Sequence, residues 1–319
     1  MIDLTNSVLV TGAAGFVGSR LVHRLAAEEV ETLACVRRDI APVREGVRDI
    51  LVADLTANTD WRQVLAGVRC VVHLAARVHV MKDTAADPVK AFRAVNVEVS
   101  LNLARQSAAA GVKRFVFISS VKVNGESTPI RCAFTETDAP NPQDPYGQSK
   151  HEAEQGLLQV SVDTGMEVVI IRPPLVYGPG VKANFAALIR AVQRGWPLPL
   201  GAVHNQRSLV ALDNLVDFIV TCTTHPQAAN QTFLVSDGQD LSTTELVHGI
   251  SQAAGVPARL LSVPVWALQA GASLLGKGDA AQRLCGNLHV DITKARMLLG
   301  WVPPITVEEG LKIAMERGI

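Results

Sequence analysis

The sequence is poor in the residues that typify secreted, metal-binding or membrane-spanning proteins. Its five cysteines lie at least 35 positions apart and its eight histidines form no HExxH motif, so neither a disulfide framework nor a zinc site is indicated. Thirty basic and thirty acidic residues leave no net charge, which disfavours nucleic acid or an anionic membrane as a partner. No apolar run reaches the ~18 residues that span a bilayer, and Met1–Leu4 lacks the features of a signal peptide. We therefore expect a cytoplasmic protein without a metal.

What the sequence does contain, in its first half, is an alternation of short β-branched runs with longer helical patterns. This alternation is typical of a parallel sheet wrapped by helices. The runs are almost wholly apolar, as expected for strands that are covered on both faces. They lie at Val8–Val10, Leu33–Val36, Ile50–Val52, Cys70–Leu74, Phe115–Ile118 and Val168–Ile171, with helical patterns near 17–27, 88–110 and 146–163. The sequence predicts an α/β fold with a doubly wound parallel sheet.

The alternation ends after residue 172. Proline and glycine cluster at 173–180 and 195–201, which predicts long loops. The remainder is mainly helical in pattern, with capping-box spacing at Ser242–Glu245 and Thr306–Glu309. One strand–helix excursion is expected to return to the first sheet. We expect two domains, a dinucleotide-binding domain of residues 1–172 plus about 207–235, and a smaller α-rich substrate domain of residues 173–206 plus 236–319.

A glycine-rich loop follows the first predicted strand. It contains Gly12, Gly15 and Gly18, with Phe16 and Val17 leading into a helical pattern. Glycines at this spacing permit a tight turn, close approach of the backbone to a pyrophosphate, and close helix–strand packing. The helix N-terminus then offers N–H groups and a positive dipole end to the phosphates. This context predicts a dinucleotide site, with a plain turn as the weaker interpretation.

The end of the second predicted strand bears on which nicotinamide cofactor binds. An acidic residue there would bind the ribose 2′-hydroxyl and select NAD. Arg37 and Arg38 follow the strand instead, and guanidiniums can bind the 2′-phosphate of NADP. NADP(H) is therefore preferred and NAD(H) is the alternative, with Asp39 or a merely solvated strand end as competing interpretations. Further cofactor contacts are expected after the third and fourth strands, from Asp54, Leu55, Leu74, Ala75 and Ala76.

Only two tyrosines are present, and one of them precedes a lysine by four residues. Tyr146 and Lys150 share one face of a predicted helix. A phenol with a pKa near ~10 must approach ~7 to exchange protons at neutral pH. A nearby ammonium and a positively charged nicotinamide can stabilise the phenolate. Ser120 follows the fifth predicted strand, and its hydroxyl can hydrogen-bond the substrate oxygen with which Tyr146 exchanges a proton. These residues predict acid–base chemistry beside a dinucleotide.

Taken together, these motifs resemble the extended short-chain dehydrogenase/reductases, specifically the nucleotide-sugar epimerase/dehydratase group. The resemblance covers nearly the whole chain, and it implies a doubly wound nucleotide domain, a C-terminal substrate domain and an active site between them. The segments that carry it are residues 11–18, Asp54-Leu55, His73–Ala76, Asn96, Phe117–Ser120, Pro145–Lys150, Arg172–Gly180 and Leu299–Trp301.

The resemblance also implies roles for individual residues. Ser120, Tyr146 and Lys150 would form the catalytic triad, supported by Asn96, and Arg207 would meet the substrate diphosphate. Cofactor contacts would also come from Asn96, Tyr146, Lys150 and Pro173. The implied substrate contacts are Ser120, Lys122, Tyr146, Asn184, Arg207 and Arg283. Helices near 88–110 and 146–163 would pair across a two-fold axis in a homodimer.

Two departures narrow the expected reaction. Where the 4,6-dehydratases of this family carry Thr-Asp-Glu, this chain has Ser120-Val121-Lys122, and valine can supply neither acid nor base. The second departure, Lys122, resembles the relatives of this family that reduce UDP-4-keto-6-deoxy-N-acetylhexosamines. A loop lysine that faces solvent is an interpretation of equal weight. We expect NADPH-dependent reduction of such a UDP-sugar in cell-surface polysaccharide precursor synthesis. The alternatives are a UDP-hexose 4-epimerase with tightly bound NAD and, more remotely, a non-catalytic NADP-binding regulator.

Overall fold

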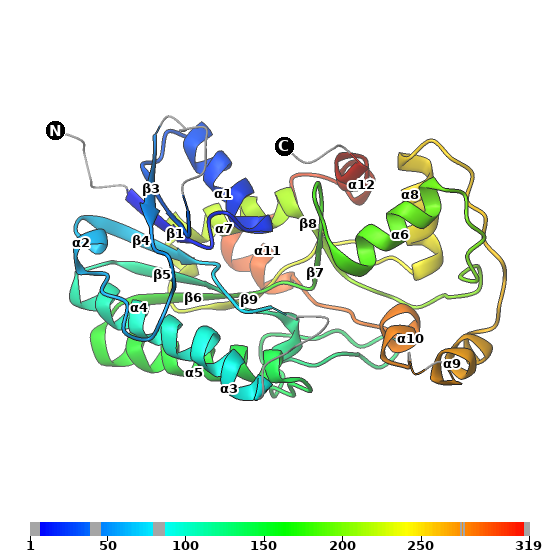
Figure 1. Ribbon diagram of the computed structural model, residues 1–319, viewed down its shortest axis with the longest axis horizontal. Coiled ribbons are helices and arrows are strands. Elements are labelled where there is room, and N and C mark those ends of the chain that lie inside the picture. Colours follow the sequence, from blue (N-terminus) through cyan, green and yellow to red (C-terminus); the bar gives the residue numbers. More distant parts are fainter. Residues whose placement is uncertain (1–6, 39–45, 79–86, 275, 277, 316–319) are drawn as a thin grey trace.

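The central feature of the molecule is a seven-stranded parallel sheet in the order β3-β2-β1-β4-β5-β6-β9 (Figure 1). The computed structural model describes residues 7–38, 46–78, 87–274, 276 and 278–315. The strands are β1 (Ser7–Thr11), β2 (Thr32–Val36), β3 (Val47–Leu51), β4 (Val68–His73), β5 (Arg114–Ile118), β6 (Glu167–Arg172) and β9 (Thr232–Leu234). All six predicted strands belong to this sheet, so the doubly wound architecture is confirmed.

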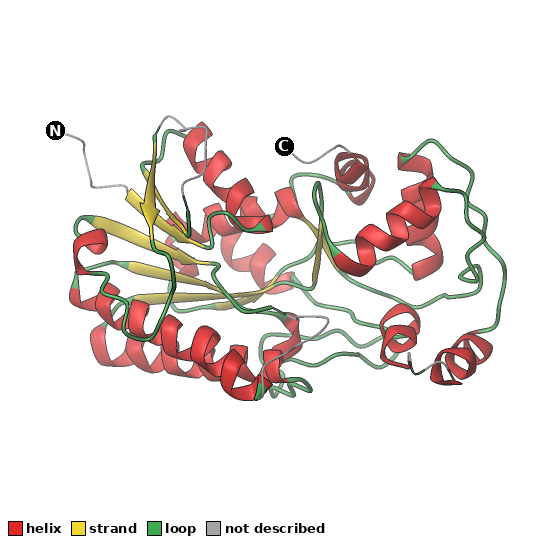
Figure 2. Cartoon of the chain, viewed as in Figure 1, coloured by secondary structure: helices red, strands yellow, loops and turns green. Residues whose placement is uncertain are grey.

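Helices cover both faces of the sheet (Figures 1 and 2). Since successive strand side chains point to opposite faces, Val8 and Val10 join the core under one helical layer and Leu9 joins the core under the other. The first layer contains α1 (Phe16–Ala27), α7 (Leu212–Thr224) and α11 (Thr293–Leu299). The second contains α2 (Arg62–Leu65), α3 (Pro88–Arg93), the π-helix η2 (Ala94–Glu98), α4 (Val99–Ala109) and α5 (Pro145–Thr164).

A separate, mainly helical region follows β6 and lies at the opposite end of the molecule from α2 (Figure 1). It has its own core around Tyr177, Phe185 and Leu311. Its elements are β7 (Leu175–Tyr177), α6 (Ala183–Gln193), β8 (Leu209–Ala211), α8 (Thr243–Ala253), α9 (Val265–Leu274), α10 (Gly278–Cys285) and α12 (Val307–Met315). β7 pairs in parallel with β8. The prediction that 173–180 is entirely loop is therefore wrong at β7, because pairing and burial of the Tyr177 ring outweigh the flanking prolines and glycines.

Two predicted helix-capping boxes and one predicted strand in the second half of the chain are confirmed. Ser242 and Glu245 form a reciprocal capping box at the start of α8, and Thr306 and Glu309 exchange the same pair of hydrogen bonds before α12. β9 joins the main sheet beside β6, as expected for the excursion near 207–235. The exact domain boundaries stay a prediction.

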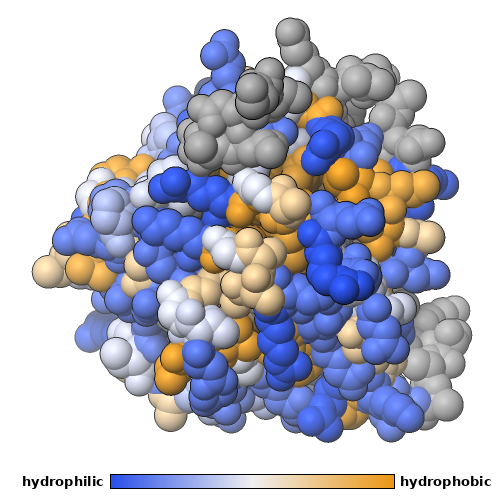
Figure 3. Space-filling view, turned by 90° about the vertical axis from the view of Figure 1, so that its left-hand side faces the viewer, coloured by the Kyte–Doolittle hydropathy of each residue, from blue (hydrophilic) through white to orange (hydrophobic). Residues whose placement is uncertain are grey.

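The surface is mixed in character. Figure 3 shows polar and apolar side chains interspersed over the end of the molecule that carries α2. Within the ranges described above, no helix combines the length and apolarity that crossing a membrane requires.

Candidate active site

The glycine loop lies at the carboxyl end of β1, next to the point where the strand order reverses between β1 and β4. Gly12 has a positive φ of 70°, and a Cβ there would lie 2.8 Å from the backbone nitrogen of Ala75. A Cβ at Gly18 would lie only 2.1 Å from the Gly12 carbonyl oxygen. In the described part of the chain, no side chain caps the start of α1. The backbone there has the close packing and N–H supply that fit a dinucleotide pyrophosphate.

The end of β4 is joined directly to this loop. Leu74 donates its backbone N–H to the Thr11 carbonyl at 3.2 Å, and Ala75 donates its N–H to the Thr11 hydroxyl at 3.3 Å. Leu74, Ala75 and Ala76 are all half-buried. The structure thus brings these small residues beside the glycines, as the sequence predicted.

The residues that bear on NAD versus NADP lie at the ends of β2 and β3. Arg37 and Arg38 are both exposed and follow β2 directly. Asp39 lies outside the described residues. After β3, Asp54 is exposed and Leu55 is half-buried against the second core. The structure thus gives two exposed arginines directly after the strand, and the competing carboxylate is outside the described part of the chain.

Ser120 and Tyr146 lie close together, near enough for the Ser120 hydroxyl to lower the pKa of the phenol. Ser120 follows β5 and caps the short 3-10 helix η3 (Val121–Val123), and Tyr146 is the second residue of α5. The pKa of Tyr146 is raised to about 12, by burial first and by the Asp144 carboxylate second, against the lowering effect of the Ser120 hydroxyl. Burial therefore outweighs the Ser120 hydroxyl, and the lowering of the pKa expected from Lys150 together with a bound nicotinamide stays a prediction.

Lys150 is fully buried one turn after Tyr146 on α5. Its Nζ donates to the Ile118 carbonyl at 2.7 Å and lies 4.4 Å from the centre of the Phe117 ring. Burial lowers the pKa of Lys150 to about 7, against the opposing effect of the Glu154 carboxylate. An ammonium so poised changes its charge near neutral pH.

Asn96 lies in η2, the π-helical turn between α3 and α4. Its Nδ2 donates to Ser149 Oγ at 2.9 Å and to the Arg77 carbonyl at 3.0 Å. Its Oδ1 accepts from the Arg77 backbone N–H at 2.8 Å. The turn thus aims a fully buried amide at the residue that precedes Lys150. π-Helical turns are frequent at functional sites, and the position agrees with the supporting role expected for Asn96.

Four further predicted site residues are Pro173, Arg207, Arg283 and Asn184. Pro173 accepts a hydrogen bond from the Val121 backbone at 3.0 Å, beside Ser120. The pKa of Arg207 is lowered, first by burial and then by the positive charge of Arg283. The two guanidiniums are therefore close enough to repel each other. Arg207 also donates to the Gly286 carbonyl at 2.9 Å, and Arg283 is exposed on α10. Asn184 is exposed in the first turn of α6.

Lys122 differs from the free ammonium envisaged beside a sugar. Its Nζ donates to Glu126 Oε1 at 2.8 Å and also binds the Asp144 carboxylate. The side chain is 26% exposed, so the solvent-facing interpretation is only partly right. A contact between Lys122 and a substrate stays a prediction.

Two buried polar networks support the site and were not anticipated. Arg172 binds Glu154 through two hydrogen bonds, and Ser119 donates to the same carboxylate at 2.5 Å. Thr11 and Ser100 flank His73 at 2.7 and 2.8 Å. Burial, followed by the charge of Lys150, lowers the pKa of His73 to about 3, so this histidine is neutral. Nothing in the residue spacing pairs positions 154 and 172; only the adjacency of β5, β6 and α5 does.

The described residues contain no cluster of side chains that could hold a metal ion. They do fit a nicotinamide dinucleotide, since a glycine cradle, an uncapped helix start and a Ser–Tyr–Lys set lie along the carboxyl edge of one sheet. This arrangement can combine hydride exchange with proton transfer at one substrate oxygen.

Comparison with known proteins agrees with this geometry. A profile of the NAD dependent epimerase/dehydratase family matches residues 8–236. The chain belongs to this family. It is 48% identical to a UDP-glucose 4-epimerase of Vibrio cholerae over 97% of this chain and 94% of that protein. It is 30% identical to a UDP-glucose 4-epimerase of Mycolicibacterium smegmatis, covering 97% of both chains.

The fold of this epimerase/dehydratase family member is also found among solved structures. MoeE5 in complex with UDP-glucose and NAD superposes with a TM-score of 0.74 and 25% identity, covering 97% of both chains. The resemblance inferred from the sequence motifs is confirmed. The protein is an NAD(P)-dependent enzyme of the extended short-chain dehydrogenase/reductase type, which excludes the non-catalytic regulator.

Proposed function

We propose that this protein is a UDP-hexose 4-epimerase that works with tightly bound NAD. The observation that carries the proposal is the 48% identity to a UDP-glucose 4-epimerase along nearly the entire chain. The reductase activity expected first from the sequence has weaker support, because both curated relatives described above are named epimerases. The 4-epimerase activity, which was the alternative to the reductase in the sequence analysis, therefore has the stronger support.

Tyr146 is the acid–base group of the proposed reaction. It takes the proton of the C4 hydroxyl and returns it when the ketone is reduced on its opposite face. Ser120, whose hydroxyl lies near the phenol, holds the same substrate oxygen and so fixes its orientation. Bound NAD would accept the C4 hydride and give it back.

The other residues of the site hold the cofactor and the phenol in register. The N–H groups at the start of α1 would hold the pyrophosphate, and Lys150, buried next to the Ser149 that Asn96 binds, would hold the nicotinamide ribose. The Lys150 ammonium favours the phenolate of Tyr146, since opposite charges stabilise each other in a buried site. Because the pKa of Lys150 is about 7, the ammonium loses its proton above that pH and no longer stabilises the Tyr146 phenolate.

The substrate diphosphate is proposed to bind at Arg207 and Arg283. Two guanidiniums that repel each other gain most when an anion lies between them. This site joins the region of 173–206 plus 236–319 to the dinucleotide-binding region, which supports the two-domain division. Asn184 and Lys122 are proposed as further contacts near the nucleotide and the sugar.

One observation favours the reductase as a second candidate. Arg37 and Arg38 are exposed at the end of β2, where they could bind the 2′-phosphate of NADP. Incubation with a UDP-4-keto-6-deoxyhexosamine and NADPH separates the candidates. A reductase consumes one NADPH per sugar, whereas the epimerase leaves NADPH unchanged and equilibrates UDP-glucose or UDP-N-acetylglucosamine with its C4 epimer. One-to-one NADPH loss would overturn the epimerase proposal.

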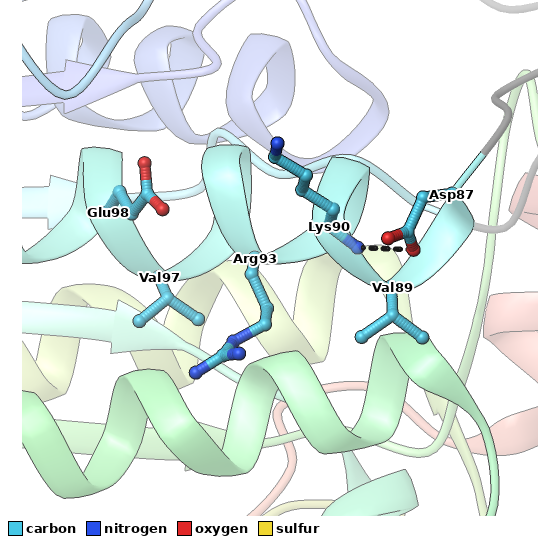
Figure 4. A pocket seen from close by; sticks show the side chains of 6 residues that line it. All are labelled: Asp87, Val89, Lys90, Arg93, Val97 and Glu98. Carbon is cyan, nitrogen blue, oxygen red and sulfur yellow. Dashed lines mark hydrogen bonds between the residues drawn. The ribbon is translucent and has the colours of Figure 1, made fainter.

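A homodimer through α3–α4 and α5 is the proposed assembly. α3 and η2 carry a shallow groove on their outer side (Figure 4), lined by Asp87, Val89, Lys90, Arg93, Val97 and Glu98. Val89, Leu158 and Val162 are exposed on α3 and α5, although Ala104 is used in the protein's own core. Light scattering at micromolar concentration should give twice 34.0 kDa, and Val162→Glu should lower the mass. A mass near that of one chain for the wild type would refute the dimer.

A further inference from the structure

Lys122 is the middle member of a row of three alternating charges that adjoins Ser120 and the N-cap of α5. Its ammonium binds the Asp144 carboxylate on one side and Glu126 Oε1, at 2.8 Å, on the other. The three side chains are each about a quarter exposed. Ion pairs that are partly withdrawn from water are screened less than surface pairs, so removal of one charge is felt by its neighbours.

Asp144 connects this chain of charges to Tyr146. It is the N-cap of α5, and its Oδ1 accepts from the Gly147 backbone N–H at 2.7 Å. Tyr146 lies two residues further on in the same helical turn. The carboxylate is close enough to the phenol to oppose its ionisation, since a like charge disfavours the charged form of a neighbouring acid.

The backbone fixes Lys122 between Ser120 and the first turn of α5. Its N–H donates to Ser120 Oγ at 3.2 Å, and its carbonyl oxygen lies 3.0 Å from where a Cβ of residue 147 would be. Gly147 therefore lets η3 pack against the first turn of α5. This contact holds the Lys122 side chain over the N-terminus of the helix that carries Tyr146.

Aromatic and cationic side chains also surround the phenol. Phe92 of α3 packs edge-on against Tyr146 at 6.1 Å, and the Arg77 guanidinium lies 5.5 Å over the Phe92 ring. Lys150, one turn along α5, directs its Nζ to the Ile118 carbonyl. On the far side of the cluster, Glu126 faces the Arg207 guanidinium.

We propose that Lys122 is a positioning residue for the reaction, whose ammonium compensates the Asp144 carboxylate and so governs how readily Tyr146 gives up its proton. In this role Lys122 acts through its ion pair with Asp144. Without it, the Asp144 carboxylate loses this counter-charge and disfavours the phenolate more strongly, so the acid–base group ionises at higher pH. The inference rests on the proposed function only in that Tyr146 is taken as the acid–base group.

The test reads the ionisation of Tyr146 directly. The chain has only two tyrosines, so biosynthetic 3,5-difluorotyrosine gives two ¹⁹F NMR signals, which a Tyr177→Phe variant assigns. The fluorines lower the pKa of the phenol into a range where the protein stays folded. No nucleotide sugar is present, so the result is independent of whether the protein is an epimerase.

Lys122→Met should raise the Tyr146 midpoint by about one pH unit, and Lys122→Arg should keep it near the wild-type value. Lys312→Met, which breaks the exposed pair with Glu308 on α12, is the matched control and should change nothing. In an Asp144→Asn background, which retains a capping oxygen, Lys122→Met should have little effect. In a turnover assay the acidic limb of the pH profile should move to higher pH with the same variants.

Two results would overturn the proposal. One is an unchanged Tyr146 midpoint in a folded Lys122→Met variant. The other is an equally large shift in the Asp144→Asn background, because Lys122 would then act on the phenol without Asp144.

Discussion

The buried ion pair between Glu154 and Arg172 makes the strongest prediction about stability. Arg172 Nε and Nη2 lie 2.9 and 2.5 Å from the two Glu154 oxygens, and the side chains are only 7% and 3% exposed. Glu154→Ala removes both acceptors and leaves the guanidinium with the Asn124 Oδ1 contact at 3.0 Å. It also removes the acceptor of the Ser119 hydroxyl.

A buried charge that loses its partner costs about 3–5 kcal/mol, so Glu154→Ala should lower the free energy of unfolding by that amount. Glu308→Ala is the control, because Glu308 forms an exposed ion pair with Lys312. The Lys312 and Glu308 side chains are 58% and 61% exposed, and such pairs contribute about 0.5 kcal/mol. Urea denaturation followed by circular dichroism measures both. The double variant Glu154→Leu/Arg172→Met should be more stable than Glu154→Ala alone, since it buries no unpaired charge.

A loss below about 1 kcal/mol for Glu154→Ala would refute this reasoning, because a loss that small is expected only of an exposed pair. Equal losses in Glu154→Ala and in the double variant would refute the role assigned to the unpaired guanidinium.

Three further predictions concern the phenol, the glycine loop and the buried histidine. Tyr146→Phe should keep NAD binding, measured by calorimetry, while turnover falls about 10²–10⁴-fold; near-normal turnover would exclude Tyr146 as the acid–base group. Gly18→Ala should abolish NAD binding because its Cβ would meet the Gly12 carbonyl, whereas Gly271→Ala, with open space around its Cβ, should bind NAD normally. His73 stays neutral when folded, with a pKa of about 3, so the unfolded chain binds the extra proton as pH falls below about 6.5. Wild-type stability should therefore drop by about 2 kcal/mol more than that of His73→Gln between pH 7 and pH 5; equal drops would contradict this.

The sheet and the glycine loop are predictable from the sequence because their signals are local. Apolar runs such as Val168–Ile171 identify buried strands, and the spacing of Gly12, Gly15 and Gly18 identifies the loop. The meeting of Ser120 with Tyr146 is also within reach, since both positions match a family motif. The strand β7 was missed because its three residues stand among prolines and become a strand only through pairing with β8.

The charges around the site could not be paired from the sequence. Lys122 and Asp144 are 22 residues apart, and their contact depends on η3 packing against α5. The raised pKa of Tyr146 depends on burial, which the spacing of Tyr146 and Lys150 does not reveal. Asp144 could have been identified as an N-cap, because aspartate followed by proline is a helix-start signal.

The most direct test of the epimerase account follows one hydride. The purified protein is incubated with UDP-glucose carrying deuterium at C4, with no added cofactor, and the C4 epimer is examined by NMR and mass spectrometry. An epimerase with tightly held NAD returns the same hydride to the sugar, so the product should retain deuterium at C4. Loss of the label, or no conversion unless NADPH and a 4-keto sugar are supplied, would contradict the account.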